Sequence, residues 1–378
     1  FRSFLRLSRQ SKLMISGATI ATGLVVTLQA NSNFRVFGDV SRPLARRAVI
    51  QTSSSKSIPM CFCCSGDANK GRRGLIDFNK AAHAKVVDVS ESVVEYDVGD
   101  MKIWMLRDGT IKVPLSRMFD RVPPEAWEEY THLQSGDMAM LSSGCVLVQT
   151  RDKTNILLDT ALGIVDPPHW PANDLRHLLV HAAGLAPSEI DAVVHTHAHR
   201  DHTGWNIIRD STGAVTPLFP RATHYIQSDE WEFWGSSEEA KARTHFDTNL
   251  APLANNQMVK KVDGTHTLLD GVELVPCPGH TPGHQVVKLT SLGKRAYYIG
   301  DALHHLAQCD RPEWSPSFDY DKTMAQRARI ALMNEIAAED ALLFSPHFPF
   351  PGCGKLVKSS EAGIERFCFV PATRNQSS

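Results

Sequence analysis

The stretch THAHRDHTGW, residues 196–205, gathers three histidines and an aspartate within residues 197–203. So many polar, ionisable side chains cannot share an apolar core without partners, because burying an unsatisfied polar group is costly. The apolar run IDAVV, residues 190–194, precedes them directly and is typical of a buried strand. The cluster is therefore either a solvated loop or a binding site at the end of a strand.

The spacing of these side chains favours metal binding. Side chains alternate along an extended segment, so His197 and His199 should point the same way and can converge on one ion. Asp201 and His202 are adjacent and can reach a second ion beside the first. One zinc ion needs only four ligands, so this density of donors indicates two ions.

Further candidate ligands follow apolar runs downstream. His280 lies in the Pro/Gly-rich loop PCPGHTPGH, Asp301 follows YYIG, and His347 follows ALLFSP. The carboxylate of Asp301 offers one oxygen to each of two ions. A solvated histidine-rich loop would not account for these three residues, which lie where site residues usually lie on a rigid scaffold.

Strand and helix patterns alternate along the chain. Residues 92–114 show short apolar alternations broken at Gly99-Asp100 and at Asp108-Gly109, which predicts β-hairpins. Residues 173–184 and 320–340 predict helices, the first capped by Asn173 or Asp174 and ended by Gly184. The fold class is therefore α/β or α+β, with helices covering sheets.

Composition limits the class of partner and divides the chain. A net charge of −1 with 42% hydrophobic residues argues against a dedicated nucleic-acid binder.

No acidic residue occurs in residues 1–38, and the apolar run 13–28 is shorter than the roughly 20 residues that span a membrane. Because the region is rich in Arg and Ser, we expect residues 1–85 to be a targeting or anchor-like extension and linker, with an organellar transit segment favoured over secretion or membrane anchoring. Residues 86–365 would form the catalytic domain and 366–378 a tail. The thiols of Cys61, Cys63 and Cys64 lack a fourth ligand nearby, so a linker without metal is expected there.

These motifs resemble those of the metallo-β-lactamase superfamily. The H-x-H-x-D-H pattern is matched by His197, His199, Asp201 and His202, and the G-H-T-P-G-H loop by residues 279–284. Asp301 and His347 match the remaining ligand positions, and Asp159 in LLDTALG matches an aspartate that supports the site. Over roughly residues 93–357 the resemblance implies an αββα four-layer sandwich with the metal site at one edge.

The resemblance extends to the methyl parathion hydrolase and lactonase-like branch. It implies that His197, His199 and His280 hold one ion and Asp201, His202 and His347 the other, with Asp301 between them. The ions would be Zn²⁺, although the same ligands also suit iron, manganese and cobalt. We assign catalytic roles to Asp201 and to His304, which stands where acyl-homoserine lactonases of the superfamily carry a tyrosine. His195 and His284 are expected to support the site without binding metal.

The function expected from this set is hydrolysis of a small-molecule ester, lactone or phosphotriester by a metal-bridging hydroxide. A glyoxalase-II-type thioesterase, a phosphodiesterase and a non-catalytic metal-binding module are the alternatives, and a homodimer and an N-terminal membrane or targeting interaction stay open. Candidates for an apolar pocket wall are four tryptophans, Trp170, Trp205, Trp231 and Trp234.

Overall fold

The computed structural model describes residues 92–163, 174–209, 214–361 and 364–372, apart from the side chains of 360–365, and the backbone of a few short strands before residue 92. Contacts between Cα atoms divide the chain into two units, Phe1–Met60 and Cys61–Ser378. In the first unit the described strands form three antiparallel pairs, which are β1 (Arg6–Leu7) with β2 (Ser11–Lys12), β3 (Thr19–Ile20) with β4 (Gly23–Leu24), and β5 (Val36–Phe37) with β6 (Val49–Ile50).

Most of the predicted N-terminal extension lies outside the described residues, as do Cys61, Cys63 and Cys64. The domain boundary at residue 85 and the targeting role of residues 1–85 therefore stay predictions. Among the residues that the structure describes, no helix is long and apolar enough to cross a membrane.

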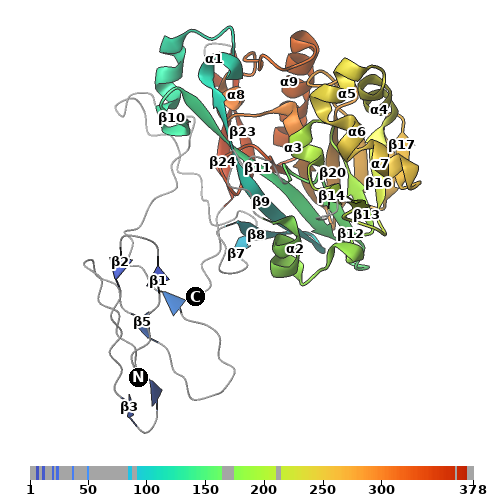
Figure 1. Ribbon diagram of the computed structural model, residues 1–378. Helices are drawn as coiled ribbons and strands as arrows, with labels where there is room; N and C mark the ends of the chain where they lie inside the picture. The colour runs from blue at the N-terminus through green and yellow to red at the C-terminus, as the bar shows by residue number, and fades with distance from the viewer. Residues whose placement is uncertain are drawn as a thin grey trace. The chain divides into compact units, whose positions relative to one another are not determined.

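The first sheet of the second unit joins nine described strands in the order β17-β16-β13-β12-β11-β9-β8-β7, with β10 paired to β11 (Figure 1). The pairs from β12 through β13 and β16 to β17 are parallel and the others antiparallel. The strands are β7 (Ala84–Val86), β8 (Val93–Val98), β9 (Met101–Pro114), β10 (Gln134–Ser135), β11 (Met138–Gln149), β12 (Asn155–Leu158), β13 (Ala192–Val194), β16 (Thr223–Gln227) and β17 (Val259–Val262).

The second sheet runs in sequence order from β18 to β24, and only β21 and β22 pair in parallel among its described strands. Its strands are β18 (His266–Leu269), β19 (Val272–Pro276), β20 (Gln285–Ser291), β21 (Lys294–Tyr298), β22 (Leu342–Phe344), β23 (Cys353–Glu361) and β24 (Ile364–Pro371). A separate antiparallel pair joins β14 (Ile207–Arg209) to β15 (Val215–Pro217).

Strand alternation divides the apolar side chains between an inner and an outer core. On β11, Val146 belongs to the cluster between the two sheets, whereas its neighbour Leu147 packs with helix residues outside the first sheet. On β21, Tyr298 lies between the sheets and Tyr297 packs under the helix of the second sheet. Each sheet thus has two apolar faces, which requires a helix layer on its outer side.

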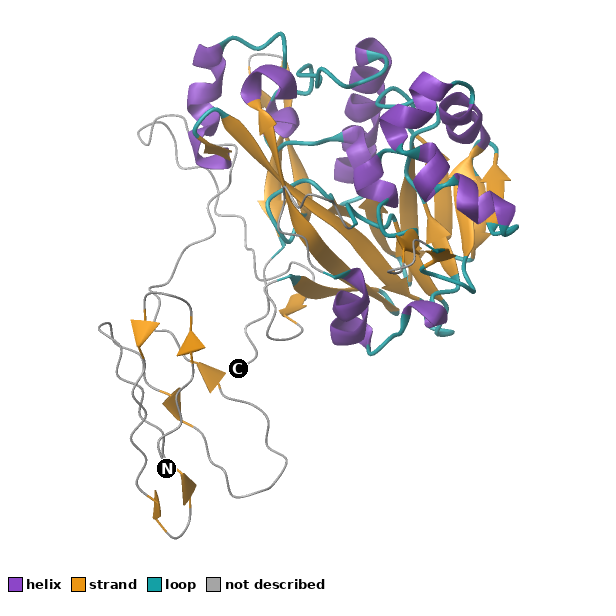
Figure 2. Ribbon diagram, viewed as in Figure 1, coloured by secondary structure: helices purple, strands orange, loops and turns teal. Residues whose placement is uncertain are grey.

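Helices supply those outer layers. Helix α2 (Leu175–Ala183) packs on the first sheet; the side chain of Asp174 caps its N-terminus and Gly184, in the left-handed conformation, ends it. Helix α9 (Lys322–Ala338) packs on the second sheet through Leu332, Met333 and Ile336. The predicted αββα four-layer sandwich is confirmed, with strands inside and helices outside (Figure 2). The other helices are α1 (Leu115–Met118), η2 (Pro124–Leu133), η3 (Pro187–Glu189), α3 (Arg200–Thr203), α4 (Ser228–Gly235), α5 (Glu238–Thr244), α6 (Phe246–Asn249), α7 (Ala251–Asn255), η4 (Gly300–Ala302) and α8 (Ala307–Asp310).

The turn predicted at Asp108-Gly109 was wrong. Strand β9 runs through it unbroken, and the register against β11 shifts there, so Arg107 faces Gly144, Gly109 faces Ser143, and Asp108 is the extra residue of a bulge. Turn-forming residues also suit bulges, which re-aim a side chain without ending the strand.

The C-terminal strand extends beyond the position where we expected a tail. Strand β24 continues to Pro371, and Phe367 and Phe369 are buried under the outer face of the second sheet. The aromatic residues of this strand therefore belong to the domain core.

Candidate metal centre

The seven predicted ligands come from loops that follow strands. His197 and His199 lie in the segment after β13, and the single turn of α3 that follows carries Asp201 and His202. His280 lies between β19 and β20. Asp301 follows β21 and His347 follows β22. The two sheets thus bring residues from distant parts of the chain to one edge of the sandwich.

Two glycines of the motif loop at 279–284 allow close packing around His280. A Cβ on Gly279 would lie 2.2 Å from the backbone nitrogen of Ala325 in α9, and the φ of Gly279 is +134°. A Cβ on Gly283 would lie 2.2 Å from the backbone nitrogen of Glu230 in α4. Both spacings are shorter than any side chain tolerates, so the loop holds His280 in place by direct backbone contact with two helices.

Three histidine nitrogens and one carboxylate oxygen form the first donor set. His199 Nδ1 lies 3.0 Å from both His197 Nε2 and His280 Nε2. Asp301 Oδ2 lies 3.1 Å from His280 Nε2 and 3.5 Å from His197 Nε2. All four donor atoms lie within 4.8 Å of one another, as the ligands of one ion must.

The second donor set uses the other oxygen of the same aspartate. Asp301 Oδ1 lies 3.0 Å from His202 Nε2 and 2.9 Å from His347 Nε2. Asp201 Oδ2 completes the set at 3.8 Å from His202 Nε2 and 3.7 Å from His347 Nε2. Asp301 therefore stands between two donor sets and presents one oxygen to each.

Four of the ligand histidines have an oxygen atom close to Nδ1, on the side of the ring away from the donor sets. That oxygen fixes the orientation of the ring. The Nδ1 atoms of His202 and His280 lie 2.8 and 2.9 Å from carboxylate oxygens of Asp159 and Asp319. The Nδ1 of His347 lies 2.8 Å from the carbonyl oxygen of Ser142, and that of His197 lies 3.0 Å from the hydroxyl of Thr196. An Nδ1–H that donates outward leaves the lone pair of Nε2 pointing inward, which is the form that binds a metal.

The electrostatics of the two sets suit a cation. Burial lowers the pKa of His197 and of His199 well below the usual value, so both rings are neutral. Burial also lowers the pKa of His202, but the carboxylates of Asp301 and Asp159 outweigh it and hold that pKa well above the usual value. Asp301 Oδ1 and His202 Nε2 are buried and, although they lie 3.0 Å apart, neither makes a hydrogen bond. Imidazole nitrogens and carboxylate oxygens around such a point are a donor set for divalent zinc-like ions.

The structure separates the remaining histidines by position. His304 Nε2 lies 3.0 Å from Asp301 Oδ2. His284 Nε2 accepts a hydrogen bond from the backbone N–H of Asp301 at 3.0 Å. His195 turns away from both donor sets and pairs with His224, its Nε2 3.1 Å from His224 Nδ1. Neither His195 nor His284 joins a donor set.

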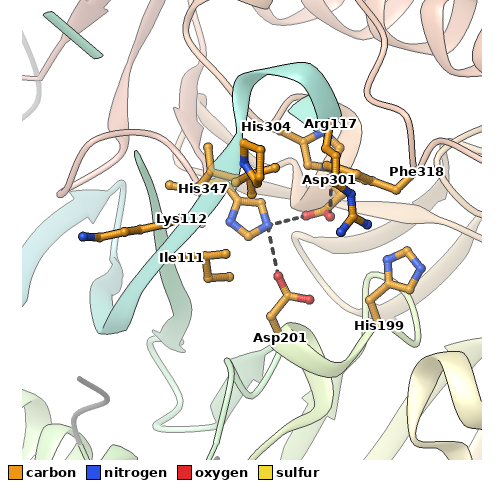
Figure 3. A pocket seen from close by; sticks show the side chains of 12 residues that line it. Ile111, Lys112, Arg117, His199, Asp201, Asp301, His304, Phe318 and His347 are labelled. Carbon is orange, nitrogen blue, oxygen red and sulfur yellow. Dashed lines mark hydrogen bonds and ion pairs between the residues drawn. The ribbon is translucent and has the colours of Figure 1, made fainter. Parts of the chain in front are cut away.

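A cavity of about 290 Å³ opens over the two donor sets (Figure 3). Its floor includes His199, Asp201, Asp301, His304 and His347, and its walls come from strand β9, helix α1, strand β11 and a loop before α9. The wall residues are Ile111, Lys112, Val113, Pro114, Arg117, Leu141 and Phe318.

Three of the four tryptophans expected to form this wall lie elsewhere. Trp205 and Trp234 are buried in hydrophobic clusters, Trp231 packs against the second of these clusters, and Trp170 lies outside the described residues. The aliphatic end of β9 forms the wall instead, because that strand is long enough to reach past the sheet edge to the site.

Two supporting carboxylates were missed by the sequence analysis. Asp319 stands behind His280, and Glu230 on α4 accepts hydrogen bonds from the backbone N–H groups of Ala198 and Gly283. Glu230 thereby links the loop of His197 and His199 to the loop of His280. Neither residue lies in a motif with the ligands, so no local pattern could have identified it.

Comparison with known proteins agrees with this geometry. The family described as the metallo-beta-lactamase superfamily matches residues 141–335, which is more than half of the chain. The chain belongs to the metallo-β-lactamase superfamily. The superfamily predicted from the sequence is confirmed, and proteins that the chain resembles are described as lactonases and hydrolases.

Two curated relatives of this superfamily member are lactonases. An N-acyl homoserine lactonase of Bacillus sp. is 27% identical over 171 residues, which cover 40% of this chain and 60% of the relative. The N-acyl homoserine lactonase AttM of Agrobacterium fabrum strain C58 is 26% identical over 207 residues, which cover 49% of this chain and 70% of the relative. The chain thus spans less than two thirds of the length of the first.

A solved structure covers more of this superfamily member. The hydrolase AbOPH, described as belonging to the beta-lactamase superfamily, superposes with a TM-score of 0.65 at 25% sequence identity. The superposition covers 76% of this chain and 100% of AbOPH. The fold of AbOPH is therefore matched along its whole length.

Proposed function

We propose that this protein is a dinuclear metal-dependent hydrolase that cleaves an ester or lactone bond of a small molecule. The observation that carries the proposal is Asp301, whose two carboxylate oxygens face two separate donor sets at 2.9–3.5 Å. A protein that bound one structural ion would not need a second complete set.

Each donor set would hold one divalent ion. His197, His199 and His280 would hold the first and Asp201, His202 and His347 the second, with Asp301 between the two. Zinc suits these ligands, and such a pair supplies a hydroxide nucleophile near neutral pH and a Lewis acid for the substrate oxygen.

The protein's own groups position this chemistry. Asp159 and Asp319 hold the rings of His202 and His280 in the orientation that directs their lone pairs inward. His304 contacts Asp301 and lines the cavity, so it can orient the substrate or steady the developing oxyanion. Ile111 and Val113 of β9 give one side of the cavity an apolar surface.

The lactonase relatives support a carbonyl substrate. The two curated relatives described above are lactonases. An ester, a lactone and a phosphotriester place a comparable polarised oxygen beside the nucleophile, so phosphotriester cleavage on this site is part of the same proposal.

The test combines metal content with kinetics. Elemental analysis of the zinc-loaded protein should return two ions per chain, and steady-state assays should show turnover of at least one compound in a panel of lactone, aryl ester, phosphotriester and thioester. One ion or fewer after gentle loading would contradict the dinuclear site. If only the thioester is hydrolysed, the proposed ester or lactone substrate is wrong and the protein is a thioesterase.

A matched pair of variants checks the ligand assignment. His199→Ala removes a donor and should abolish both the first ion and turnover. His195→Ala removes a buried ring outside the donor sets and should keep the metal content, at a cost of at most about 10–100-fold in turnover. Equal loss of metal in both variants would show that the assignment is wrong.

A further inference from the structure

We infer that the substrate carries a carboxylate, which the guanidinium of Arg117 binds at the wall of the cavity. The inference rests on the proposed function, because it names the substrate class of the same site. It also departs from the lactonase relatives, since an N-acyl homoserine lactone is a neutral molecule.

The side chain of Arg117 faces the cavity without a partner of its own. In Figure 3 its guanidinium points toward Asp301 and Phe318, whereas the ammonium of Lys112 points away from the carboxylates. Within the described part of the chain the guanidinium makes no hydrogen bond or ion pair. The nearby carboxylate of Asp120 pairs with Lys322 instead, at 2.6 Å. Arg117 is therefore available to a ligand.

The backbone of Arg117 is held in place. Its carbonyl oxygen accepts hydrogen bonds from the hydroxyl of Ser317 at 2.7 Å and from the backbone N–H of Ser317 at 3.3 Å. The next two residues, Met118 and Phe119, are fully buried and anchor the short helix α1. This anchoring fixes the backbone from which the exposed side chain of Arg117 reaches the wall of the cavity that Phe318 also lines.

The charge balance of the cavity favours an anion. Its lining contains two cations, Lys112 and Arg117, and two acids, Asp201 and Asp301. Both acids face the histidine donor sets, and two divalent ions there would carry twice the charge of the two carboxylates. The side chain of Arg117 is exposed, so a neutral substrate would leave the guanidinium solvated, whereas an anionic substrate would gain a charge-assisted hydrogen bond from it.

Chemistry and size narrow the anion to a carboxylate on a compact molecule. A single guanidinium fork matches one carboxylate with two parallel hydrogen bonds. A cavity of about 290 Å³ is at the small end for ligand sites. Ile111, Val113 and Leu141 supply apolar wall for a short acyl or aryl body. The class that fits is a small ester or lactone with a carboxylate on the side of Arg117.

The kinetic test compares 4-acetoxybenzoate with its methyl ester on the zinc-loaded enzyme. The two compounds share the aryl acetate bond, whose cleavage is followed through the released phenol, and differ in the para group, which is a carboxylate in one and its neutral methyl ester in the other. We expect kcat/KM to be at least 10-fold higher for the carboxylate. Arg117→Gln should remove most of that preference, a loss of about 10-fold, mainly through KM, as expected when a hydrogen bond to a charged group is lost.

Lys112→Gln is the matched control, because it removes one positive charge from the same wall without removing the group that faces the donor sets. It should keep the preference. No preference in the wild type, an unchanged preference in Arg117→Gln, or an equal loss in Lys112→Gln would overturn the inference.

A binding measurement separates this inference from the proposed function. Calorimetric titration of the zinc-loaded protein measures the affinity for glutarate, which has two carboxylates, and for butyrate, which has one. Glutarate should bind at least 10-fold more tightly, and Arg117→Gln should remove the difference. If the difference is present but no compound of the panel is hydrolysed, the carboxylate site stands and the proposed hydrolase function fails. Equal binding of the two acids refutes the carboxylate site even if hydrolysis is found.

Discussion

Asp301 is the residue on which both donor sets depend. Its carboxylate oxygens face different sets of histidines, and its backbone N–H donates to His284 Nε2. The His284 ring in turn contacts the carbonyl oxygen of Cys277, with 3.1 Å between that oxygen and Nδ1. The His284 ring, held on both sides, fixes the backbone of Asp301 and thus the point from which its carboxylate reaches the two donor sets. His284 thus supports the centre without being a ligand.

Metal ligands could be predicted from the sequence because their chemistry requires particular residue types at short spacing. His197, His199, Asp201 and His202 lie within one short segment, and that density is rare without a bound ion. Asp319 could not be predicted, because it is 39 residues from the His280 ring that it orients and a lone aspartate in a loop has many ordinary roles.

At the same scale, His304→Ala should keep both ions and lower turnover of the best substrate by about 10²–10³-fold, the range for one lost oxyanion donor. His304 contacts Asp301 and lines the cavity but belongs to neither set around the proposed ions. His304→Tyr should recover part of the lost turnover when a lactone is the test substrate, because a phenol hydroxyl also donates at neutral pH. The test is to measure turnover and metal content of each variant. Wild-type turnover in His304→Ala would show that the residue only lines the wall.

Single side chains also connect whole elements. The carboxylate of Asp108, which the bulge in β9 turns out of the strand, accepts hydrogen bonds from the backbone N–H groups of Leu162 and Gly163 and from Trp205 Nε1. It thereby ties β9 to the loop after β12 and to the segment after α3. Glu230 does the same for the two histidine loops from helix α4.

Elements were predictable where the sequence has a clear period. Strands β8, β11, β12, β13, β20 and β21 and helices α2 and α9 follow from alternation, helical spacing and caps. Helices α4 to α7 do not, because they are four to eight residues long and pack through scattered aromatic residues such as Trp234 and Phe246. Tertiary packing determines such short helices.

At the scale of elements, Glu230→Gln should weaken metal binding by about 10–100-fold. Glu230 Oε1 accepts from Ala198 N–H and Trp234 Nε1, and Oε2 accepts from Gly283 N–H. An amide has only one acceptor oxygen, so its NH₂ group would face a buried donor, at a cost of about 1–3 kcal/mol. Competition with a chelator measures the zinc affinity, and denaturant unfolding measures stability.

The control for that variant is Glu232→Gln on the same helix. The side chain of Glu232 is 67% exposed and pairs with Lys261 at the surface. Such pairs contribute little, so metal affinity and stability should stay at the wild-type level. Zinc affinity within about twofold of wild type in Glu230→Gln would show that the loops keep their positions without the carboxylate.

His305 is a buried, neutral histidine that lies outside the metal centre and affects the stability of the whole fold. His305 is buried beside the Phe119 and Trp127 rings, with centroid distances of 6.2 and 5.5 Å. Burial lowers the pKa of His305 to about 4; the charged forms of His132 and His304 act in the same direction, and a backbone hydrogen bond with Leu133 acts against it. Global unfolding returns this ring to water, where its pKa has the ordinary value near 6.5.

The sign of the resulting pH dependence follows from proton binding. Between pH 6.5 and 4 the unfolded chain binds a proton at His305 and the folded protein does not, so stability falls as the pH falls. The lowered pKa corresponds to about 3 kcal/mol of folding free energy, present above pH 6.5 and lost near pH 4. Removing the ring should therefore remove that part of the acid sensitivity.

The variant for this prediction is His305→Asn, whose side-chain oxygen can replace Nδ1 as acceptor for the backbone N–H of Ala307, now 3.2 Å from Nδ1. Denaturant unfolding of both proteins is measured from pH 7 to pH 4 in the same chelator. The metal-ligand histidines titrate in both, so their contribution cancels in the difference. We expect the stability advantage of the wild type to shrink by up to about 3 kcal/mol across this range. A difference that stays constant with pH would mean that His305 is protonated in the folded protein, or that unfolding leaves the aromatic cluster around it intact.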